Sequence, residues 1–477
     1  MSIRRVFVAN RGEIAVRIIR ACRALGIETV VAVSDADRET MAAQLADRAV
    51  CIGPARSTLS YLNIGAVVTA AVGTGCDALH PGYGFLAENA RLAEECAKAG
   101  VVFIGPRPET IREMGNKIRA RALAERAGVP VVPGDNNVAD YDQAVSVARE
   151  IGFPILLKAA SGGGGRGMQV VREMSELRRA FETATAEATA AFGDGTLYIE
   201  RYIANARHIE IQILGDRFGK VLHLGERDCT LQRRHQKIVE EGPATLVAEP
   251  ILQRIRKAAV DLAVGVNYEN AGTVEFIFDQ DRNDFFFLEV NTRIQVEHPV
   301  TEALTGVDLV QEQIRISSNE PLKFTQDDIK LTGHAIECRI NAESAEHAFR
   351  PSPGLISKWE KVDHDYVRFD THCYPGYVVP PFYDSMLAKV IVVGKDRAEA
   401  VARMQSVLEE ISVKGVATTI PFLRTLLARP EYVAGTVNTR WVEAVMAEPG
   451  FATKPGLERA HPTVPKQSAD SFVAAAL

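Results

Sequence analysis

The 477-residue sequence has few features of a membrane, secreted or redox protein. No uninterrupted apolar run approaches the roughly 20 residues that span a membrane. The apolar stretch in MSIRRVFVANRGE is too short for a signal peptide and predicts a first strand instead. Seven scattered cysteines form no CxxC pair, which favours reduced, core-filling thiols over disulfides, metal binding or redox chemistry. We therefore expect a cytoplasmic protein with no membrane partner.

An excess of basic residues is also lacking, because 61 aspartates and glutamates outnumber 55 lysines and arginines. The formal net charge of −6 argues against a nucleic-acid partner, which would require a basic surface, although it is compatible with a local basic pocket. With 47% hydrophobic and 24% charged residues, the composition is that of a globular protein. The length exceeds what one core covers, so we expect two or three domains.

Residues 1 to about 115 alternate strand and helix patterns. RRVFVANRGEIAVRIIRACRALGIETVVAVS predicts a strand, a turn, an amphipathic helix and a second strand, and the alternation continues to GVVFIGP. This pattern is typical of a small doubly wound domain. Its first turn, NRGE, lacks the GxGxxG motif, so the sequence does not support a dinucleotide site.

The rest of the chain predicts mixed α and β units. After a proline-containing hinge near residue 130, FPILLKAASGGGGRGMQVV predicts two strands joined by a glycine-rich loop, followed by a helix over 175–191. Strands then dominate to residue 298, interrupted by a helix at about 249–265. Residues 331 to about 446 predict another mixed unit with its own strands. The last 31 residues contain four prolines and predict a loosely ordered tail.

The loop GGGGRG (162–167) carries the first chemical signal. Four consecutive glycines are costly in backbone entropy, and their bare N–H groups can fold over phosphates. The loop lacks the GK[ST] of a P-loop, so taken alone it fits a flexible hairpin and a phosphate site equally. Lys158, at the end of the apolar strand before the glycines, favours phosphate binding.

Acidic side chains interrupt two neighbouring apolar strands. Glu275 lies in EFIF, while Glu289 and Asn291 share one face of the strand that opens FFFLEVNTRIQVEHP. Charges in such runs are costly unless they are paired or bound to metal. Either glutamate alone would more often pair with a buried arginine. Two carboxylates and an amide, downstream of a candidate polyphosphate loop, favour Mg²⁺.

ERDCTLQRRHQKIVEE contains a basic run of Arg227, Arg233, Arg234, His235 and Lys237. From the sequence alone, a solvated charge run and an anion site are equally compatible with it. Salt bridges to Glu240 and Glu241 would account for some of these charges, and a small anionic substrate would use one or two others.

These strings together resemble the biotin carboxylases, which are ATP-grasp enzymes. The resemblance rests on ANRGEIA.R, HPGYGFL.EN, FIGP, MG.K, the glycine loop, ERDC..QRRHQK, E.NTRIQVEHPVTE, GHAIECRINAE, PSPG and YDSM, and it is nearly collinear from residue 3 to about 445. It implies an α/β and α+β fold with the following parts: a doubly wound pre-ATP-grasp domain (1–115), an ATP-grasp domain (116–320) with a mobile lid (about 130–203), a C-terminal biotin carboxylase domain (321–446) and the tail (447–477).

The resemblance also implies the site residues. ATP would contact Lys117, Lys158, Gly164, Gly165, Glu200, the backbone of Ile203, His208, His235, Glu275 and Glu289, and the last two would bind Mg²⁺ or Mn²⁺ together with Asn291. Bicarbonate would be surrounded by Lys237, Arg293, Gln295 and the backbone of Val296, where the strand would bend into a loop. Glu297 would be the general base that leads to carboxyphosphate, and Arg339 would stabilise the biotin enolate.

Three departures from the family pattern avoid these residues. Ser161 stands where many relatives have glycine, DQDRNDFFFLE is slightly long, and Arg350 replaces an apolar residue. Their positions do not put activity in doubt.

No AMKM-like biotinylation string occurs, and the chain ends before a carrier domain could fit, so we expect a freestanding subunit. Its partners would be a biotin carboxyl carrier protein and carboxyltransferase subunits, most simply in acetyl-CoA carboxylation for fatty acid biosynthesis, with pyruvate, propionyl-CoA or another acceptor as alternatives. The resemblance suggests a homodimer, and Arg17, Arg20 and Arg23 offer a contact along one side of the first helix, unless they are simply solvated. The competing interpretations are another ATP-grasp ligase and a non-catalytic subunit that only binds ATP. The intact bicarbonate and biotin residues argue against both.

Overall fold

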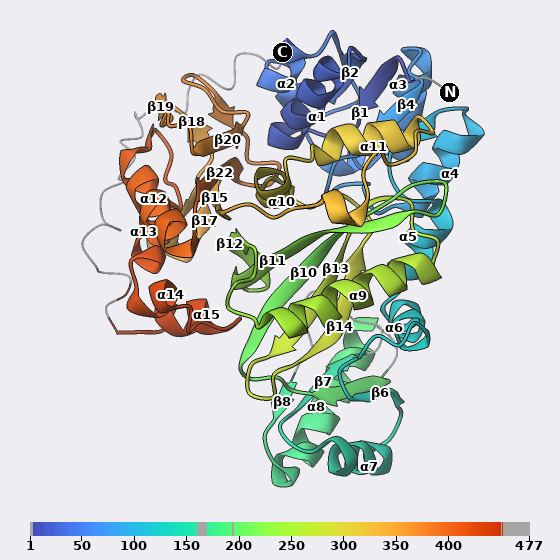
Figure 1. Ribbon diagram of the computed structural model, residues 1–477, viewed down its shortest axis with the longest axis vertical. Helices are drawn as coiled ribbons and strands as arrows, with labels where there is room; N and C mark the ends of the chain where they lie inside the picture. Colours follow the sequence, from blue (N-terminus) through green and yellow to red (C-terminus); the bar gives the residue numbers. More distant parts are fainter. Residues whose placement is uncertain (1–2, 160–168, 193–194, 450, 452–477) are drawn as a thin grey trace, which may run out of the picture.

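The computed structural model describes residues 3–159, 169–192, 195–449 and 451. Figure 1 shows three regions around one long sheet: the N-terminal residues at the top, a small unit at the bottom formed by residues near 130–200, and the C-terminal helices at the left. Most of the predicted tail (450 and 452–477) and the glycine loop, with Gly164, Gly165 and Ser161, lie outside the described residues.

The N-terminal region is a doubly wound parallel sheet, as the alternating pattern predicts. Its strand order is β3-β2-β1-β4-β5. Apolar strand residues such as Val6 and Phe7 are fully buried because helices cover both faces. The strands are β1 (Arg5–Val8), β2 (Glu28–Val33), β3 (Arg48–Cys51), β4 (Ala78–His80) and β5 (Val102–Phe103), and the helices are α1 (Gly12–Ala24), α2 (Met41–Leu45), α3 (Ile64–Gly73), α4 (Ala90–Lys98) and α5 (Pro108–Met114).

The small unit at the bottom of Figure 1 is an antiparallel sheet with two helices packed on it. Its strand order is β6-β9-β7-β8, and the predicted hairpin on either side of the glycine loop is the β7–β8 pair. Helix α6 (Lys117–Arg126) leads into it. The other elements are β6 (Gly134–Val138), α7 (Tyr141–Ile151), β7 (Ile155–Ala159), β8 (Gln169–Val171), α8 (Met174–Phe192) and β9 (Leu197–Arg201).

An eight-stranded antiparallel sheet forms the centre of the molecule, in the order β14-β13-β10-β11-β12-β15-β22-β20. The strands are β10 (Ala206–Gly215), β11 (Val221–Arg233), β12 (Gln236–Gly242), β13 (Asn270–Asp279), β14 (Asp284–Asn291), β15 (His334–Asn341), β20 (Val367–Thr371) and β22 (Met386–Gly394). The strands predicted for the C-terminal unit are present as β15 and β22, and because β15 pairs with β12, they extend the same sheet together with β20.

Helix α9 (Glu249–Gly265) packs on β10 and β11, and α10 (His298–Thr305) follows the end of β14. The remaining helices are α11 (Leu309–Ser317), α12 (Arg397–Glu410), α13 (Ile420–Leu427), α14 (Pro430–Ala434) and α15 (Trp441–Met446). Short strand pairs complete the C-terminal region: β16 (Glu343–Ser344) with β17 (Arg350–Pro351), β18 (Gly354–Leu355) with β21 (Val378–Val379), and β19 (Lys358–Glu360) with β23 (Ser412–Lys414).

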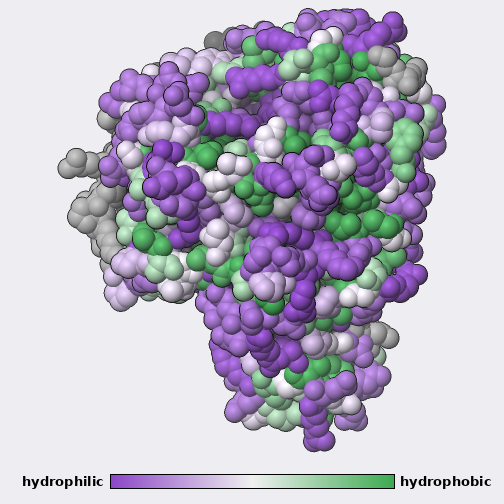
Figure 2. Space-filling model, in the orientation of Figure 1, coloured by the Kyte–Doolittle hydropathy of each residue, from purple (hydrophilic) through white to green (hydrophobic). Residues whose placement is uncertain are grey.

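The molecular surface bears on two of the expectations. Hydrophilic side chains predominate on the face in Figure 2, with hydrophobic ones in small groups, and none of the described helices is long and apolar enough to cross a membrane. The interpretation of Arg17 as an exposed contact is wrong. Its guanidinium is buried, 2.7 Å from Glu302 and 2.7 Å from Asp308, whereas Arg20 and Arg23 are exposed.

Candidate active site

A cleft of about 1340 Å³ opens where the three regions meet the central sheet. Most of the predicted site residues line it, although they come from strands far apart in the sequence. These residues are Lys117, Lys158, Glu200, Ile203, His208, His235, Lys237, Glu275, Glu289, Asn291, Arg293, Gln295, Val296 and Arg339. Glu297 lies just beneath the lining and is fully buried.

The ammonium group of Lys237 is the centre of the charge network. Its Nζ lies 2.5 Å from Glu210, 2.8 Å from Glu275 and 2.8 Å from Glu297. Burial alone would lower the pKa of Lys237, but these three carboxylates outweigh it and raise the pKa well above its usual value. Lys237 is therefore a permanent cation at the floor of the cleft.

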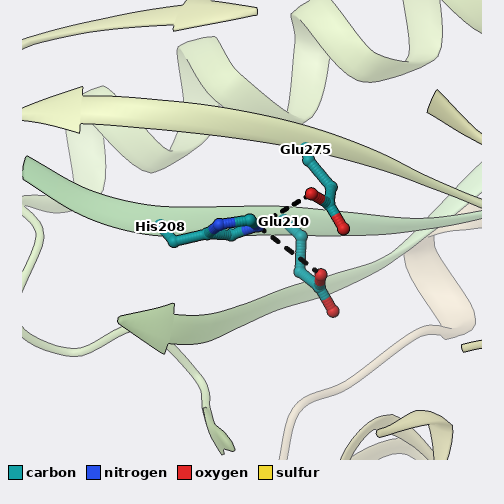
Figure 3. A group of neighbouring side chains, drawn as sticks. All are labelled: His208, Glu210 and Glu275. Atoms are coloured by element: carbon teal, nitrogen blue, oxygen red, sulfur yellow. Dashed lines mark ion pairs between the residues drawn. The ribbon is translucent and has the colours of Figure 1, made fainter. Parts of the chain in front are cut away.

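His208, Glu210 and Glu275 gather on adjacent strands, as Figure 3 shows. His208 Nε2 lies 3.0 Å from Glu275 Oε2 and 4.0 Å from Glu210, while Gln232 Nε2 lies 2.9 Å from His208 Nδ1. Such a group has the composition of a metal site, but Lys237 forms ion pairs with both of its carboxylates, and Arg227 forms another with Glu210. We therefore interpret it as an ion-pair network.

A better metal site lies on the outer strand pair. Glu275 and Glu289 lie on the neighbouring strands β13 and β14, as predicted, and the register places them directly opposite each other. Asn291 Nδ2 donates to Glu275 over 2.8 Å. Burial and the negative charge of Glu275 raise the pKa of Glu289. Two facing carboxylates and an amide oxygen fit Mg²⁺, since a divalent cation relieves this repulsion.

Beyond Asn291 the chain leaves the sheet, which confirms the predicted bend near Arg293. Arg293 Nε donates to Glu88 over 3.0 Å and its Nη2 to Asn291 over 3.1 Å. Gln295 donates to Glu275 over 3.0 Å. This segment therefore presents a guanidinium and an amide beside Lys237, and that set of donors suits a small anion.

Glu297 is held between two cations. Its Oε1 lies 2.8 Å from Lys237 and its Oε2 2.8 Å from Arg339, which also donates to Glu240 over 2.6 Å. Burial alone would raise the pKa of Glu297, but Lys237, Arg339 and Arg227 hold it well below its usual value. Glu297 is therefore a carboxylate at neutral pH and can accept a proton.

The predicted nucleotide residues lie toward the small unit. Lys158 on β7 forms an ion pair with Glu200 on β9. Lys117, the first residue of α6, lies 3.7 Å from Glu289 on β14. His235, at the β11–β12 turn, is exposed with a φ of 65°. Each of the two lysines thus lies beside a glutamate of the cleft lining.

The basic run is not a solvated surface. Arg227 is fully buried and donates to Glu210 over 2.5 Å, and the Arg233 guanidinium lies 3.8 Å from the centre of the Phe349 ring. Arg234 and His235 alone in the run are exposed. The suggested salt bridges to Glu240 and Glu241 are also wrong, since these pair with Arg339 and with Arg397 and His334.

Sequence reasoning missed several members of the network. Glu210 lies within the apolar HIEIQIL of β10, and Lys389 within LAKVIVV of β22. The signal used for Glu275, a charge in an otherwise buried strand, applies equally to both. Glu88 pairs with Arg293 but precedes it by about 200 residues, so no local pattern connects them.

Comparisons with known proteins agree with this geometry. Three family models match consecutive segments: "Biotin carboxylase, N-terminal domain" (2–111), "Carbamoyl-phosphate synthase L chain, ATP binding domain" (116–325) and "Biotin carboxylase C-terminal domain" (337–444). Biotin carboxylase 1 of Bacillus subtilis is 50% identical over 442 residues, covering 92% of this chain and 98% of the relative. A pyruvate carboxylase subunit of Methanothermobacter thermautotrophicus is 50% identical over 440 residues, covering 92% and 89%.

Among solved structures, the biotin carboxylase domain dimer of Hydrogenobacter thermophilus 2-oxoglutarate carboxylase, in complex with MgADP, ADP and bicarbonate, matches with a TM-score of 0.87. It is 44% identical, and the match covers 95% of this chain and 100% of that one. Similarity of this extent, over a cleft that unites paired cations, a buried carboxylate and facing glutamates, shows that the chain belongs to the biotin carboxylase family.

Proposed function

We propose that the chain carboxylates biotin held by a separate carrier protein, using ATP and bicarbonate. The observation that carries the proposal is Glu297, an ionised carboxylate between Lys237 and Arg339 that immediately precedes α10. The ATP-binding region alone would not decide the matter, because its family model is named for carbamoyl-phosphate synthase. The bicarbonate and biotin residues favour biotin carboxylase over another ATP-grasp ligase. A non-catalytic subunit would not need to keep all of them.

In the first step, bicarbonate lies against Lys237, Arg293, Gln295 and the Val296 N–H. Glu297 takes the bicarbonate proton, and the oxyanion attacks the γ-phosphorus of ATP as the bond to the β-phosphate oxygen breaks. The products are ADP and carboxyphosphate. Glu275, Glu289 and Asn291 would hold Mg²⁺, which would supply positive charge that offsets the charge of the phosphates.

In the second step, carboxyphosphate breaks into CO₂ and phosphate, and the phosphate takes the proton of the biotin ureido nitrogen. Arg339 stabilises the enolate oxygen, and the nitrogen attacks CO₂. Lys117, Lys158, Glu200, Ile203, His208 and His235 hold the nucleotide, with Gly164 and Gly165 from the loop. The domain limits at about 115, 320 and 446, and the lid at about 130–203, belong to the same proposal.

The proposed partners are a biotin carboxyl carrier protein and carboxyltransferase subunits, in the cytoplasm and with the chain as a homodimer. The relative from H. thermophilus is described as a dimer, which supports this assembly. Acetyl-CoA carboxylation is the proposed pathway. A pyruvate, propionyl-CoA or other carboxylase is the alternative. The M. thermautotrophicus relative, at 50% identity, is named as a pyruvate carboxylase subunit, and the H. thermophilus relative is the biotin carboxylase domain of a 2-oxoglutarate carboxylase.

Free biotin assayed with the purified protein tests the activity, by following ADP release. We expect release to require biotin, bicarbonate and Mg²⁺ together. Equal release without biotin or bicarbonate would refute the proposal. Co-purification from the native cell, probed for biotin, tests the partners: a chain recovered without a biotinylated protein, yet fully active in extract, would contradict a separate carrier.

A further inference from the structure

Two residues that have no role in the reaction proposed above form hydrogen bonds to the main chain on either side of the Val296 N–H. Val296 lines the cleft, and its N–H makes no hydrogen bond within the described part of the chain. The carbonyl groups of Gln295 and Val296, in contrast, are both bonded to buried side chains. The free N–H thus lies between two fixed carbonyls.

Lys389, on β22, holds the second of these carbonyls. It is fully buried, and its Nζ donates to Val296 O over 2.8 Å. The same ammonium lies 3.1 Å from Glu13 on α1 and 3.8 Å from Asp370 on β20. A buried ammonium is costly unless it is paired, so these two carboxylates hold the Lys389 ammonium in place. Lys389 thereby connects three separate elements to one peptide group.

His298, the first residue of α10, holds the carbonyl of Gln295. Its Nδ1 lies 2.8 Å from that oxygen, and since a carbonyl only accepts, Nδ1 carries the hydrogen. Burial, followed by the charges of Lys389, Arg17 and Arg368, lowers the pKa of His298 well below its usual value. His298 is therefore a neutral imidazole with a single fixed tautomer.

The geometry of the peptide bond connects these contacts to the cleft. The Gln295 C=O and the Val296 N–H belong to one planar trans peptide, so a bond that fixes the oxygen also fixes the direction of the N–H. Lys389 fixes the following peptide plane in the same way. We infer that His298 and Lys389 are positioning residues that direct the Val296 N–H toward a small oxyanion in the cleft. This inference rests on the proposed function, in which that anion is bicarbonate.

Steady-state kinetics of His298→Leu and Lys389→Met test the inference. We expect the KM for bicarbonate to rise about tenfold or more, because a donor to a charged group contributes on that order, while the KM for ATP stays within about twofold. His298→Asn keeps an N–H donor and should restore most of the bicarbonate affinity. The matched control is Lys220→Met, because Lys220 also donates to a backbone carbonyl, that of Leu322 over 3.0 Å, far from the cleft.

Lys389→Met leaves Glu13 buried without its cation, so the double variant Lys389→Met/Glu13→Gln provides a second test where the single variant does not fold. A bicarbonate KM that stays at the wild-type value in His298→Leu and in the double variant would overturn the positioning role. Equal increases in the KM for ATP and for bicarbonate would overturn it too. If ADP release by the wild-type protein did not depend on bicarbonate, the proposed function would instead be refuted. Failure of the positioning role and failure of the proposed function are therefore distinguishable.

Discussion

Glu275 and Glu289 lie directly opposite each other in the β13–β14 register, but their surroundings differ. The Glu275 side chain is 5% exposed and accepts hydrogen bonds from Lys237, Asn291 and Gln295. The Glu289 side chain is 38% exposed, with Lys117 at 3.7 Å. Glu275 is thus part of the buried network, whereas Glu289 lies at the cleft surface and is accessible from it.

Glu289→Gln should therefore separate metal binding from folding. We expect this variant to require several-fold more Mg²⁺ for ADP release while its unfolding free energy changes by less than about 0.5 kcal/mol, because long, exposed ion pairs contribute little. Glu275→Gln should lose both activity and stability, since it leaves buried donors unpaired. Mg²⁺ titrations and thermal unfolding of both variants make the comparison. Equal destabilisation of the two would contradict the assignment.

Glu297→Gln should bind nucleotide normally and lose about 10²- to 10⁴-fold in biotin carboxylation rate, the range that a general base contributes. The change preserves the shape of the side chain and removes its ability to take the proton. Nucleotide binding by fluorescence and single-turnover carboxylation measure the two effects. Glu320→Gln, an exposed site paired with Lys323, is the control. Near-normal turnover of Glu297→Gln would show that the proton goes to another group.

Glu241 should make stability depend on acid pH. Burial alone would raise its pKa, but His334 and Arg397 lower it from 4.5 to about 2. A carboxylate whose pKa is lower in the folded state stabilises the fold fully when the pH is above its pKa in the unfolded state. That contribution is lost as the pH falls through its pKa in the folded state. About 3 kcal/mol should thus be lost between about pH 4.5 and pH 2. Denaturation series of wild type and Glu241→Gln should show a flatter curve for the variant, and Glu409→Gln, at an exposed pair, should follow the wild type.

Arg17 should matter for folding rather than for association. Its guanidinium is buried between Glu302 and Asp308, and removing one partner of a buried ion pair costs about 3–5 kcal/mol. We expect Arg17→Met to lower the unfolding temperature by several degrees, whereas Arg20→Met, on the exposed side of α1, should change it little. Similar unfolding temperatures for the two variants would contradict the buried role.

Local patterns predicted the parts of this molecule that depend on local physics. Period-two alternation predicted the strands that carry Glu275 and Glu289, and the rule against unpaired buried charges identified both residues. The same patterns could not supply partners across long distances. The pairing of Glu240 with Glu337, which places Arg339 beside Glu297, joins strands about 100 residues apart. Lys389 reaches Val296 across 93 residues, and periodicity contains no information on that contact.

The edge-to-edge pairing of β12 with β15 also limits how the chain can be divided. Cutting it in the connection before β15 would leave both fragments with a long unpaired strand, and open edges of this kind favour aggregation over independent folding. Arg339 and Glu297, which form an ion pair in the cleft, would then be on different fragments. The C-terminal region is therefore not an exchangeable module. A homologous region put in its place would have to pair with β12 in the same register before Arg339 could lie beside Glu297.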